Sequence, residues 1–224
     1  MSKQRKLRSL AATRKATRWL GYNCLSDYHG GIYDCDHVSP YTQSARNLDA
    51  DIFVLLQDWS SDLALSGPID WEAKRLGYTP TEPTNRNLSE LLKIFFNLEL
   101  ASVYASNLFP FIKQGNMTQR IPQRDLVRAA LEFAIPQIEI VAPKVVICIG
   151  LGTFNAIRRA CELRLVDNID QGQQATFCIH GAEVWCQAHT GALGRINRNK
   201  GGIDRVRADW EHMSDSLRTS FNAF

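Results

Sequence analysis

The chain has 224 residues, of which 45% are hydrophobic and 22% charged, and its formal net charge is +3. This size suits one ordinary soluble domain with a core of its own, and no apolar run is long enough to cross a membrane. The N-terminal stretch lacks the apolar core and the cleavage site of a secretory signal, so we expect a cytoplasmic protein.

The positive charge is concentrated at the N-terminus. Residues 1–18 contain seven Lys or Arg side chains and no acid, so the rest of the chain carries a net charge of −4. We therefore distinguish a basic N-terminal arm or helix, residues 1–20, from a single domain over residues 21–224. A basic arm can hold phosphates, and a solvated terminus is the alternative.

The six cysteines include no CxxC pair. Cys24, His29, Cys35 and His37 could be drawn as a metal site, but their spacing matches no common zinc pattern. We expect reduced, unpaired thiols, as is usual in cytosolic proteins, and no bound metal.

An alternation of strands and helices begins near residue 50, after an irregular loop region at 21–46 to which we assign no function. The strand-like runs are DIFVLLQ (51–57), LASVYASN (100–107), KVVICIG (144–150) and AEVWCQAH (182–189). Helix-like stretches cover 68–76, 87–98, 122–141, 152–164 and 203–221. This order predicts an α/β fold, a three-layer α/β/α sandwich with a central, mostly parallel four-stranded sheet.

Polar residues mark the points where these strands end. Asp58 follows the first strand, Asn107 ends the second, and His189 ends the fourth. Ligands of open parallel sheets bind outside the carboxyl ends of the strands, so we expect these side chains to surround one polar pocket. Taken singly, each has a simpler interpretation: a helix cap for Asp58, turn chemistry for Asn107 and a surface position for His189.

The turn after the third strand, GLGTFN (150–155), could open a dinucleotide-binding helix. However, Asn155 stands where the third glycine of that fingerprint belongs, and the motif is not near the start of the sheet. A dinucleotide-dependent oxidoreductase is therefore the less favoured alternative.

In order and spacing, these residues resemble the uracil-DNA glycosylase superfamily over residues 50–200. The first motif of its best-known branch, Gly-Gln-Asp-Pro-Tyr, corresponds to LQDWS, which keeps Gln57 and Asp58 but has Trp59 and Ser60 in place of Pro-Tyr. The resemblance implies that Asp58 positions or activates the hydrolytic water and that the backbone of Gln57 lines the base pocket.

Further residues match other roles in this family. Trp71, thirteen positions after Asp58, resembles the aromatic residue that stacks on a flipped base, although an ordinary core tryptophan is the alternative. Asn107 resembles the base-reading asparagine. The last family motif, His-Pro-Ser-Pro-Leu, corresponds to HTGAL, which keeps His189 and Leu193. The resemblance implies that His189 stabilises the leaving base and that Leu193 fills the vacated stack.

The chemistry of base excision explains these residue types. A leucine wedge and an aromatic platform offset part of the cost of flipping a base. An amide offers both a donor and an acceptor to a pyrimidine edge, while a carboxylate and an imidazole stabilise the positive sugar and the negative departing base. The reaction needs no metal or cofactor. The chain also lacks the close N-terminal cysteine pair of the family's iron–sulfur branches.

Basic residues follow the presumed wedge. The segment after His189 carries Arg195, Arg198, Lys200, Arg205 and Arg207 against one acid, Asp204. We expect it to contact DNA phosphates, and we assign Leu193, Arg195, Arg198 and Lys200 to DNA binding by a monomer. A solvated basic loop is the alternative.

Ser60 bears on the identity of the base. It stands where a tyrosine of the family blocks the C5 side of the pocket, so the substrate is either uracil or a C5-modified pyrimidine. A hydroxymethylated or glucosylated cytosine of phage DNA would make the protein an antiviral glycosylase, whereas Trp59 could instead close the gap. A competing hypothesis is a non-catalytic nucleic-acid-binding domain with the same fold.

Overall fold

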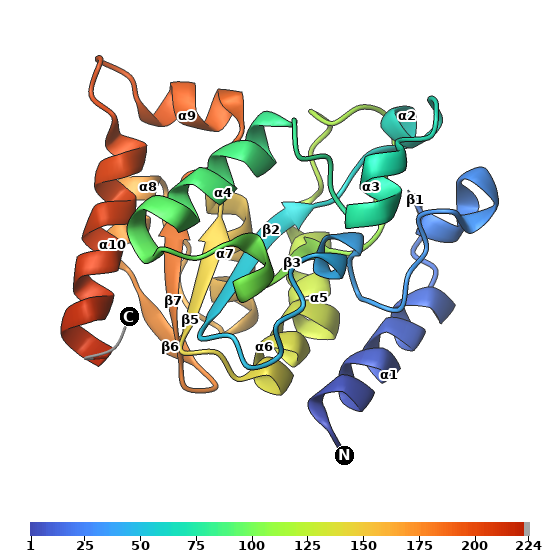
Figure 1. Ribbon diagram of the computed structural model, residues 1–224, viewed down its shortest axis with the longest axis horizontal. Helices are drawn as coiled ribbons and strands as arrows, with labels where there is room; N and C mark the ends of the chain where they lie inside the picture. Colours follow the sequence, from blue (N-terminus) through green and yellow to red (C-terminus); the bar gives the residue numbers. More distant parts are fainter. Residues whose placement is uncertain (222–224) are drawn as a thin grey trace.

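The computed structural model describes residues 1–221, so residues 222–224 of the predicted domain lie outside the described part. Figure 1 shows a central sheet with the strand order β3-β2-β5-β7-β6. Its strands are β2 (Ile52–Asp58), β3 (Tyr104–Phe109), β5 (Val145–Ile149), β6 (Phe177–Ile179) and β7 (Ala182–Gln187). β2, β3, β5 and β7 run parallel, which confirms a mostly parallel sheet, and β6 adds a fifth, antiparallel strand that we did not predict.

A tight hairpin accounts for the additional strand. Ile179 pairs with Ala182, so only His180 and Gly181 join β6 to β7, and these two residues have positive φ angles of 48° and 84°. Two consecutive positive φ angles are typical of the type I′ turn, whose twist suits a two-residue hairpin. The four predicted strands thus form the parallel part of a mixed, five-stranded sheet.

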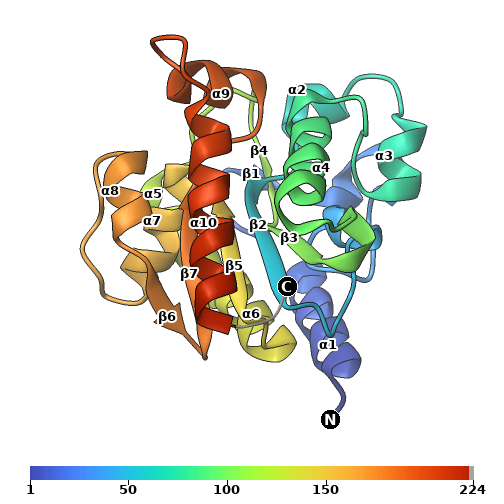
Figure 2. The ribbon, with the colours of Figure 1, turned by 60° about the vertical axis from the view of Figure 1, so that its left-hand side comes forward.

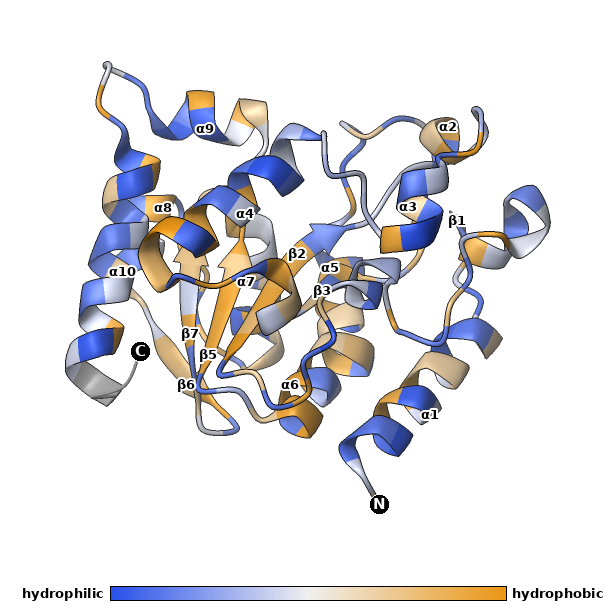
Figure 3. Cartoon of the chain, in the orientation of Figure 1, coloured by the Kyte–Doolittle hydropathy of each residue, from blue (hydrophilic) through white to orange (hydrophobic). Residues whose placement is uncertain are grey.

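The strands bury apolar side chains on both faces. The first five residues of β2 are all buried, as expected for a strand covered on both sides. Phe53 and Leu55 belong to one core cluster, whereas Val54 and its even-numbered neighbours belong to another. Figure 3 shows the strands as the apolar interior of the molecule.

Helices pack over both faces of this sheet. α4 (Pro83–Phe96) and α10 (Arg205–Phe221) contribute to the core cluster of one face, and Figure 2 shows them in front of the sheet. α5 (Gln123–Ala129), α6 (Ile135–Val141) and α7 (Leu151–Ala160) contribute to the cluster of the other face. Among the described residues, no helix is long and apolar enough to cross a lipid bilayer.

The predicted helix over 122–141 is interrupted. A five-residue π-helical segment, Ala130–Ala134, separates α5 from α6. Pro136, the second residue of α6, has no N–H to donate to the carbonyl of Glu132, so the regular hydrogen-bond ladder cannot continue through this point.

The basic N-terminal segment is a docked helix. α1 (Lys3–Ala16) packs against α6 and buries Leu7, Ala11 and Arg14, which recur on one helical face. The Arg14 guanidinium is 1% exposed and forms an ion pair with Asp34 at 2.5 Å. Ion pairs within the protein also hold Lys3, Lys15 and Arg18. Residues 1–20 are therefore packed on the domain, and four of their seven cations are already paired.

The remaining elements are short. They are β1 (Tyr22–Asn23), β4 (Ile112–Lys113), α2 (Asp62–Leu65), α3 (Trp71–Leu76), α8 (Ile169–Gln174), α9 (Ala192–Arg198) and 3-10 turns at Leu25–Asp27, His29–Gly31, Pro40–Gln43 and Leu100–Ser102. β1 pairs antiparallel with β4, and Ser61 forms an isolated bridge with Lys113. The loop region at 21–46 thereby helps to place Lys113 beside the end of β2.

Candidate active site

Two of the predicted polar residues lie where the parallel strands end. Asp58 is the last residue of β2 and His189 follows β7 by two residues. β5 separates these two parallel strands. In Figure 1 the arrowheads of β2 and β5 point toward the side of the molecule that carries α9. Asp58 does not cap a helix, because α2 begins at Asp62 with Ser61 as its N-cap.

Both carboxylate oxygens of Asp58 are held by neighbouring side chains. Lys113 Nζ lies 2.7 Å from Asp58 Oδ2, and Gln57 Nε2 donates a hydrogen bond of 3.1 Å to Oδ1. Lys113 Nζ also donates to the Met117 carbonyl at 2.6 Å. The Asp58 and Lys113 side chains are only 9% and 4% exposed. An ion pair this buried depends on its geometry, because either charge alone would be poorly solvated.

His189 has a defined hydrogen-bonding state. Its Nδ1 accepts a hydrogen bond of 3.0 Å from the Gly191 backbone N–H. The neutral ring therefore carries its proton on Nε2 and presents an N–H donor there. His189 is an exposed residue. Desolvation by the protein around the ring nevertheless lowers the pKa of His189, while Asp58 raises it and Lys113 lowers it to smaller extents. The imidazole is thus neutral at neutral pH.

These electrostatic effects join three side chains into one cluster. Charges on Asp58 and Lys113 both act on the His189 ring, although the three residues come from different parts of the chain. We call Asp58, Lys113 and His189 the charged cluster. It contains a carboxylate, a compensating cation and a neutral imidazole donor, and this combination can stabilise both signs of charge in a reaction.

Asn107 lies deeper in the sheet than predicted. β3 continues to Phe109, so Asn107 is two residues before the end of its strand, and it is 1% exposed. Asn107 pairs in register with Leu56, and side chains alternate along a strand, so Asn107 and Asp58 belong to the same face of the sheet. Ser39 Oγ donates to Asn107 Oδ1 at 2.5 Å. This contact orients the amide and leaves its nitrogen as the donor for a ligand.

The glycine turn after β5 supports Gln57. A Cβ at Gly152 would lie 2.7 Å from Gln57 Oε1, so the small residue allows helix α7 to pass close to this side chain. Asn155 bonds through its amide to the backbone N–H and C=O of Val166. Asn155, which departs from the dinucleotide fingerprint, thus has a structural role. Gly152, the second glycine of the turn, leaves room for the Gln57 side chain at the end of β2.

Ser60 and Trp59 occupy different surroundings. Ser60 is 9% exposed, next to the fully buried Ser61. Trp59 Nε1 donates to the Gly77 carbonyl at 2.7 Å, and its ring packs edge-on against Tyr33. The Trp59 side chain is thus fixed by its contacts with Gly77 and Tyr33.

Trp71 is not joined to the charged cluster by any described contact. It is the first residue of α3 and is 62% exposed. The Lys74 ammonium lies 5.0 Å from the centre of its ring, within cation–π distance. The ring is therefore a surface group and not the core tryptophan considered as its alternative.

α9 presents an apolar ridge. Leu193 and Ile196 are 68% and 64% exposed and are three residues apart, so they lie on the same side of the helix. Arg195 forms only a long ion pair of 3.7 Å with Asp204. Lys200 is exposed and forms no ion pair within the described part of the chain. Leu193, Arg195 and Lys200 are thus accessible to a large ligand.

Arg198 has a structural position instead. Its guanidinium forms two hydrogen bonds of 2.7 and 2.8 Å with Asp209 and an ion pair of 2.7 Å with Asp170. Only 10% of the side chain is exposed. The hydrogen bond that Arg198 donates to Asp209 raises the pKa of Arg198. This geometry ties α9 to α10 and leaves little of Arg198 for the predicted contact with phosphate.

Sequence reasoning missed Lys113 and Ser39. Both contact predicted site residues. Lys113 lies in β4, just after β3 ends, and Ser39 lies in the loop region at 21–46, and neither belongs to a motif identified in the sequence. All six cysteines are unpaired. Across residues 1–221, no group of three or more His, Cys, Asp or Glu side chains is arranged to hold a metal ion.

Comparison with known proteins does not place the chain in a family. A scan against protein-family models finds no match, and a search of curated proteins finds no significant relative. The charged cluster and its neighbours are therefore the features of the molecule that bear on its function.

Proposed function

We propose that this protein is a monofunctional DNA glycosylase that flips a pyrimidine out of DNA and hydrolyses its N-glycosidic bond, leaving an abasic site. The charged cluster at the carboxyl edge of the parallel strands is the observation that carries this proposal. Helices on both faces and four parallel strands support a three-layer α/β/α sandwich like that of the uracil-DNA glycosylase superfamily. In this proposal the protein acts as a cytoplasmic monomer without metal or cofactor.

Asp58 acts on the sugar. Cleavage of the bond leaves positive charge on the sugar ring, and a carboxylate whose oxygens are already oriented stabilises that charge without rearranging. The same carboxylate holds the water that adds to the sugar. Gln57 and Lys113 fix its orientation through the two contacts described above.

His189 acts on the departing base. Negative charge develops on a pyrimidine oxygen as the bond breaks, and the Nε2–H of the neutral ring donates a hydrogen bond to it. The Gly191 N–H on Nδ1 sets this tautomer. Because the pKa of His189 is lowered, the ring is neutral at the pH at which it is needed.

Recognition of the flipped base falls to residues around the cluster. With its oxygen bound by Ser39, Asn107 donates its amide N–H to the pyrimidine edge. Leu193 fills the vacated stack, and Arg195 and Lys200 contact phosphates. Trp71 is available for stacking only from the solvent side of α3.

The proposed substrates are uracil and C5-modified pyrimidines. Ser60 stands where the family's blocking tyrosine would be, and its side chain is much smaller. An open C5 side supports a modified cytosine of phage DNA and hence an antiviral role.

Cleavage assays test the proposal. Duplexes that carry one uracil, one hydroxymethylcytosine or one glucosylated hydroxymethylcytosine are incubated with the protein, and abasic sites are converted to strand breaks with alkali. We expect breaks in at least one duplex and a loss of about 100-fold or more in rate for Asp58→Asn, with DNA binding retained. Absence of breaks in all three duplexes would refute the proposal.

A second candidate, a non-catalytic DNA-binding domain, is favoured by one observation. The Lys113 ammonium compensates the charge of Asp58 and so weakens its effect on a positive sugar. The same assays separate the two candidates, because a pure binder retains DNA affinity and cleaves no duplex.

A further inference from the structure

A second polar cavity lies at the opposite end of β3 from the candidate active site. Its volume is about 450 Å³, and it is lined by Gln4, Leu7, Arg8, Asp36, His37, Thr42, Arg46, Leu48 and Tyr104. Tyr104 is the first residue of β3, whereas Asn107 and Phe109 lie toward the carboxyl edge. The cavity has the size of small-molecule sites in proteins.

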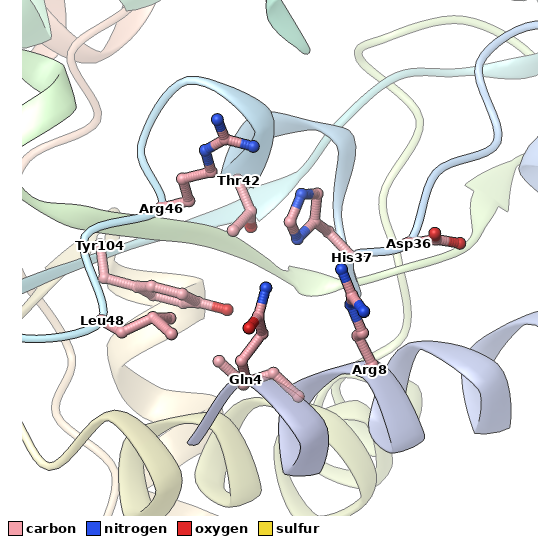
Figure 4. A pocket seen from close by; sticks show the side chains of 9 residues that line it. Gln4, Arg8, Asp36, His37, Thr42, Arg46, Leu48 and Tyr104 are labelled. Atoms are coloured by element: carbon pink, nitrogen blue, oxygen red, sulfur yellow. The ribbon is translucent and has the colours of Figure 1, made fainter. Parts of the chain in front are cut away.

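Polar groups converge on the middle of this cavity. Figure 4 shows the Gln4 amide and the Tyr104 hydroxyl pointing toward its centre, with the His37 ring and the Arg8 side chain on the facing side. Leu7 and Leu48 form an apolar part of the cavity wall. A few convergent polar groups on a partly apolar wall are typical of a ligand-binding site.

The charge of the cavity is positive. Arg8 and Arg46 are exposed and form no ion pair among residues 1–221, and both act on the His37 ring. The one acidic lining residue, Asp36, is paired with Lys15 at 2.8 Å, and Figure 4 shows its carboxylate pointing away from the centre. Two guanidinium groups without an ion-pair contact among residues 1–221 therefore act on His37.

We propose that this cavity binds a small phosphorylated ligand, with its phosphate between Arg8 and Arg46 and its organic part against Leu7, Leu48 and Tyr104. Two unpaired guanidinium groups match the two charges of a phosphate monoester, and each can donate a pair of hydrogen bonds to its oxygens. Gln4 and His37 offer additional donors. The proposal does not depend on the glycosylase activity, because the cavity shares no residue with the charged cluster.

Binding of inorganic phosphate to the full chain tests this site. Backbone amide resonances are followed by NMR during a phosphate titration, with sodium chloride of equal ionic strength as the reference. We expect saturable shifts confined to the lining residues, and binding about tenfold weaker in both Arg8→Gln and Arg46→Gln. Arg5→Gln is the matched control, since Arg5 is an exposed arginine of the same helix that does not line the cavity.

Three results would overturn the site. They are shifts that do not saturate, binding unaffected by Arg8→Gln and Arg46→Gln, and an equal loss in Arg5→Gln, which would indicate general attraction to a basic helix. A DNA duplex titrated in parallel distinguishes the source of the phosphate. Shifts of the cavity residues with DNA but not with inorganic phosphate would make the cavity a DNA contact and contradict a small ligand.

Discussion

At the scale of single residues, Lys113 controls the electrostatics of the charged cluster. Its ammonium is fixed by Asp58 on one side and by the Met117 carbonyl on the other. Desolvation is the main cause of the lowered pKa of His189, and Lys113 adds to it by opposing the influence of Asp58. A residue without a recognisable motif thus contributes to keeping the imidazole neutral.

Lys113→Met is expected to raise the pKa of His189, because a cation that lowers it is removed while Asp58 remains. An NMR titration of the imidazole measures this shift. In the wild type the pKa lies below the ordinary value of about 6.5, so the unfolded chain takes up the proton first. Folding stability should therefore fall as the pH drops below about 6.5, and less steeply in the variant.

Stability measurements must accompany that titration. Lys113→Met leaves the nearly buried Asp58 without its partner, which we expect to cost about 3 kcal/mol in urea unfolding. Lys113→Arg keeps the cation and serves as the control. An unchanged pKa of His189 in folded Lys113→Met would contradict a direct action of Lys113 on the ring.

At the scale of elements, α9 and the residues just after it provide two kinds of basic residue. Arg198 is held by acids of α8 and α10, whereas Lys200, just beyond the helix, is exposed. Arg198 therefore supports the position of the ridge formed by Leu193 and Ile196, and Lys200 is free to meet a phosphate.

Arg198→Met should affect stability, whereas Lys200→Gln should affect the salt dependence of DNA binding. The first is expected to lower the free energy of unfolding by about 2 kcal/mol, because it leaves Asp209 without its bidentate partner. The second should leave stability unchanged and reduce the slope of log Kd against log salt by about one. Denaturation and DNA binding at several salt concentrations measure both. If both variants reduced the slope of log Kd against log salt equally, Arg198 would be a phosphate contact after all.

At the scale of the whole molecule, α1 belongs to the packed structure. Leu7 and Ala11 are buried and Arg14 is paired with Asp34. Deletion of residues 1–18 is therefore expected to lower the free energy of unfolding by more than about 3 kcal/mol, measured by urea denaturation. An Arg5→Gln/Lys6→Gln variant removes two exposed charges but keeps the buried face, and it should be as stable as the wild type. A deleted protein of unchanged stability would show that the segment is a dispensable arm.

The parts of the structure that could be predicted are those with a local signal. Continuous apolar runs identified the four parallel strands, and the strand-end rule identified Asp58 and His189. Lys113 could not be found this way, because it lies beyond the end of β3, in a two-residue strand that pairs with β1 and bridges to Ser61. Trp71 was assigned by its spacing from Asp58, but such spacing does not determine whether a side chain of a short helix is buried or exposed. β6 was missed because three residues before a tight turn carry little periodicity.

The docking of α1 has a consequence for folding during synthesis of the chain. Lys3 Nζ donates to the carbonyls of Leu48 and Val141, and the helix rests on α6. Residues 3–16 therefore cannot complete their docking until residue 141 has been synthesised, because Lys3 and Val141 are 138 residues apart in the chain. Until then the apolar face formed by Leu7 and Ala11 stays exposed to solvent, although strands β5 and β7 of the sheet are made only after this docking surface is complete.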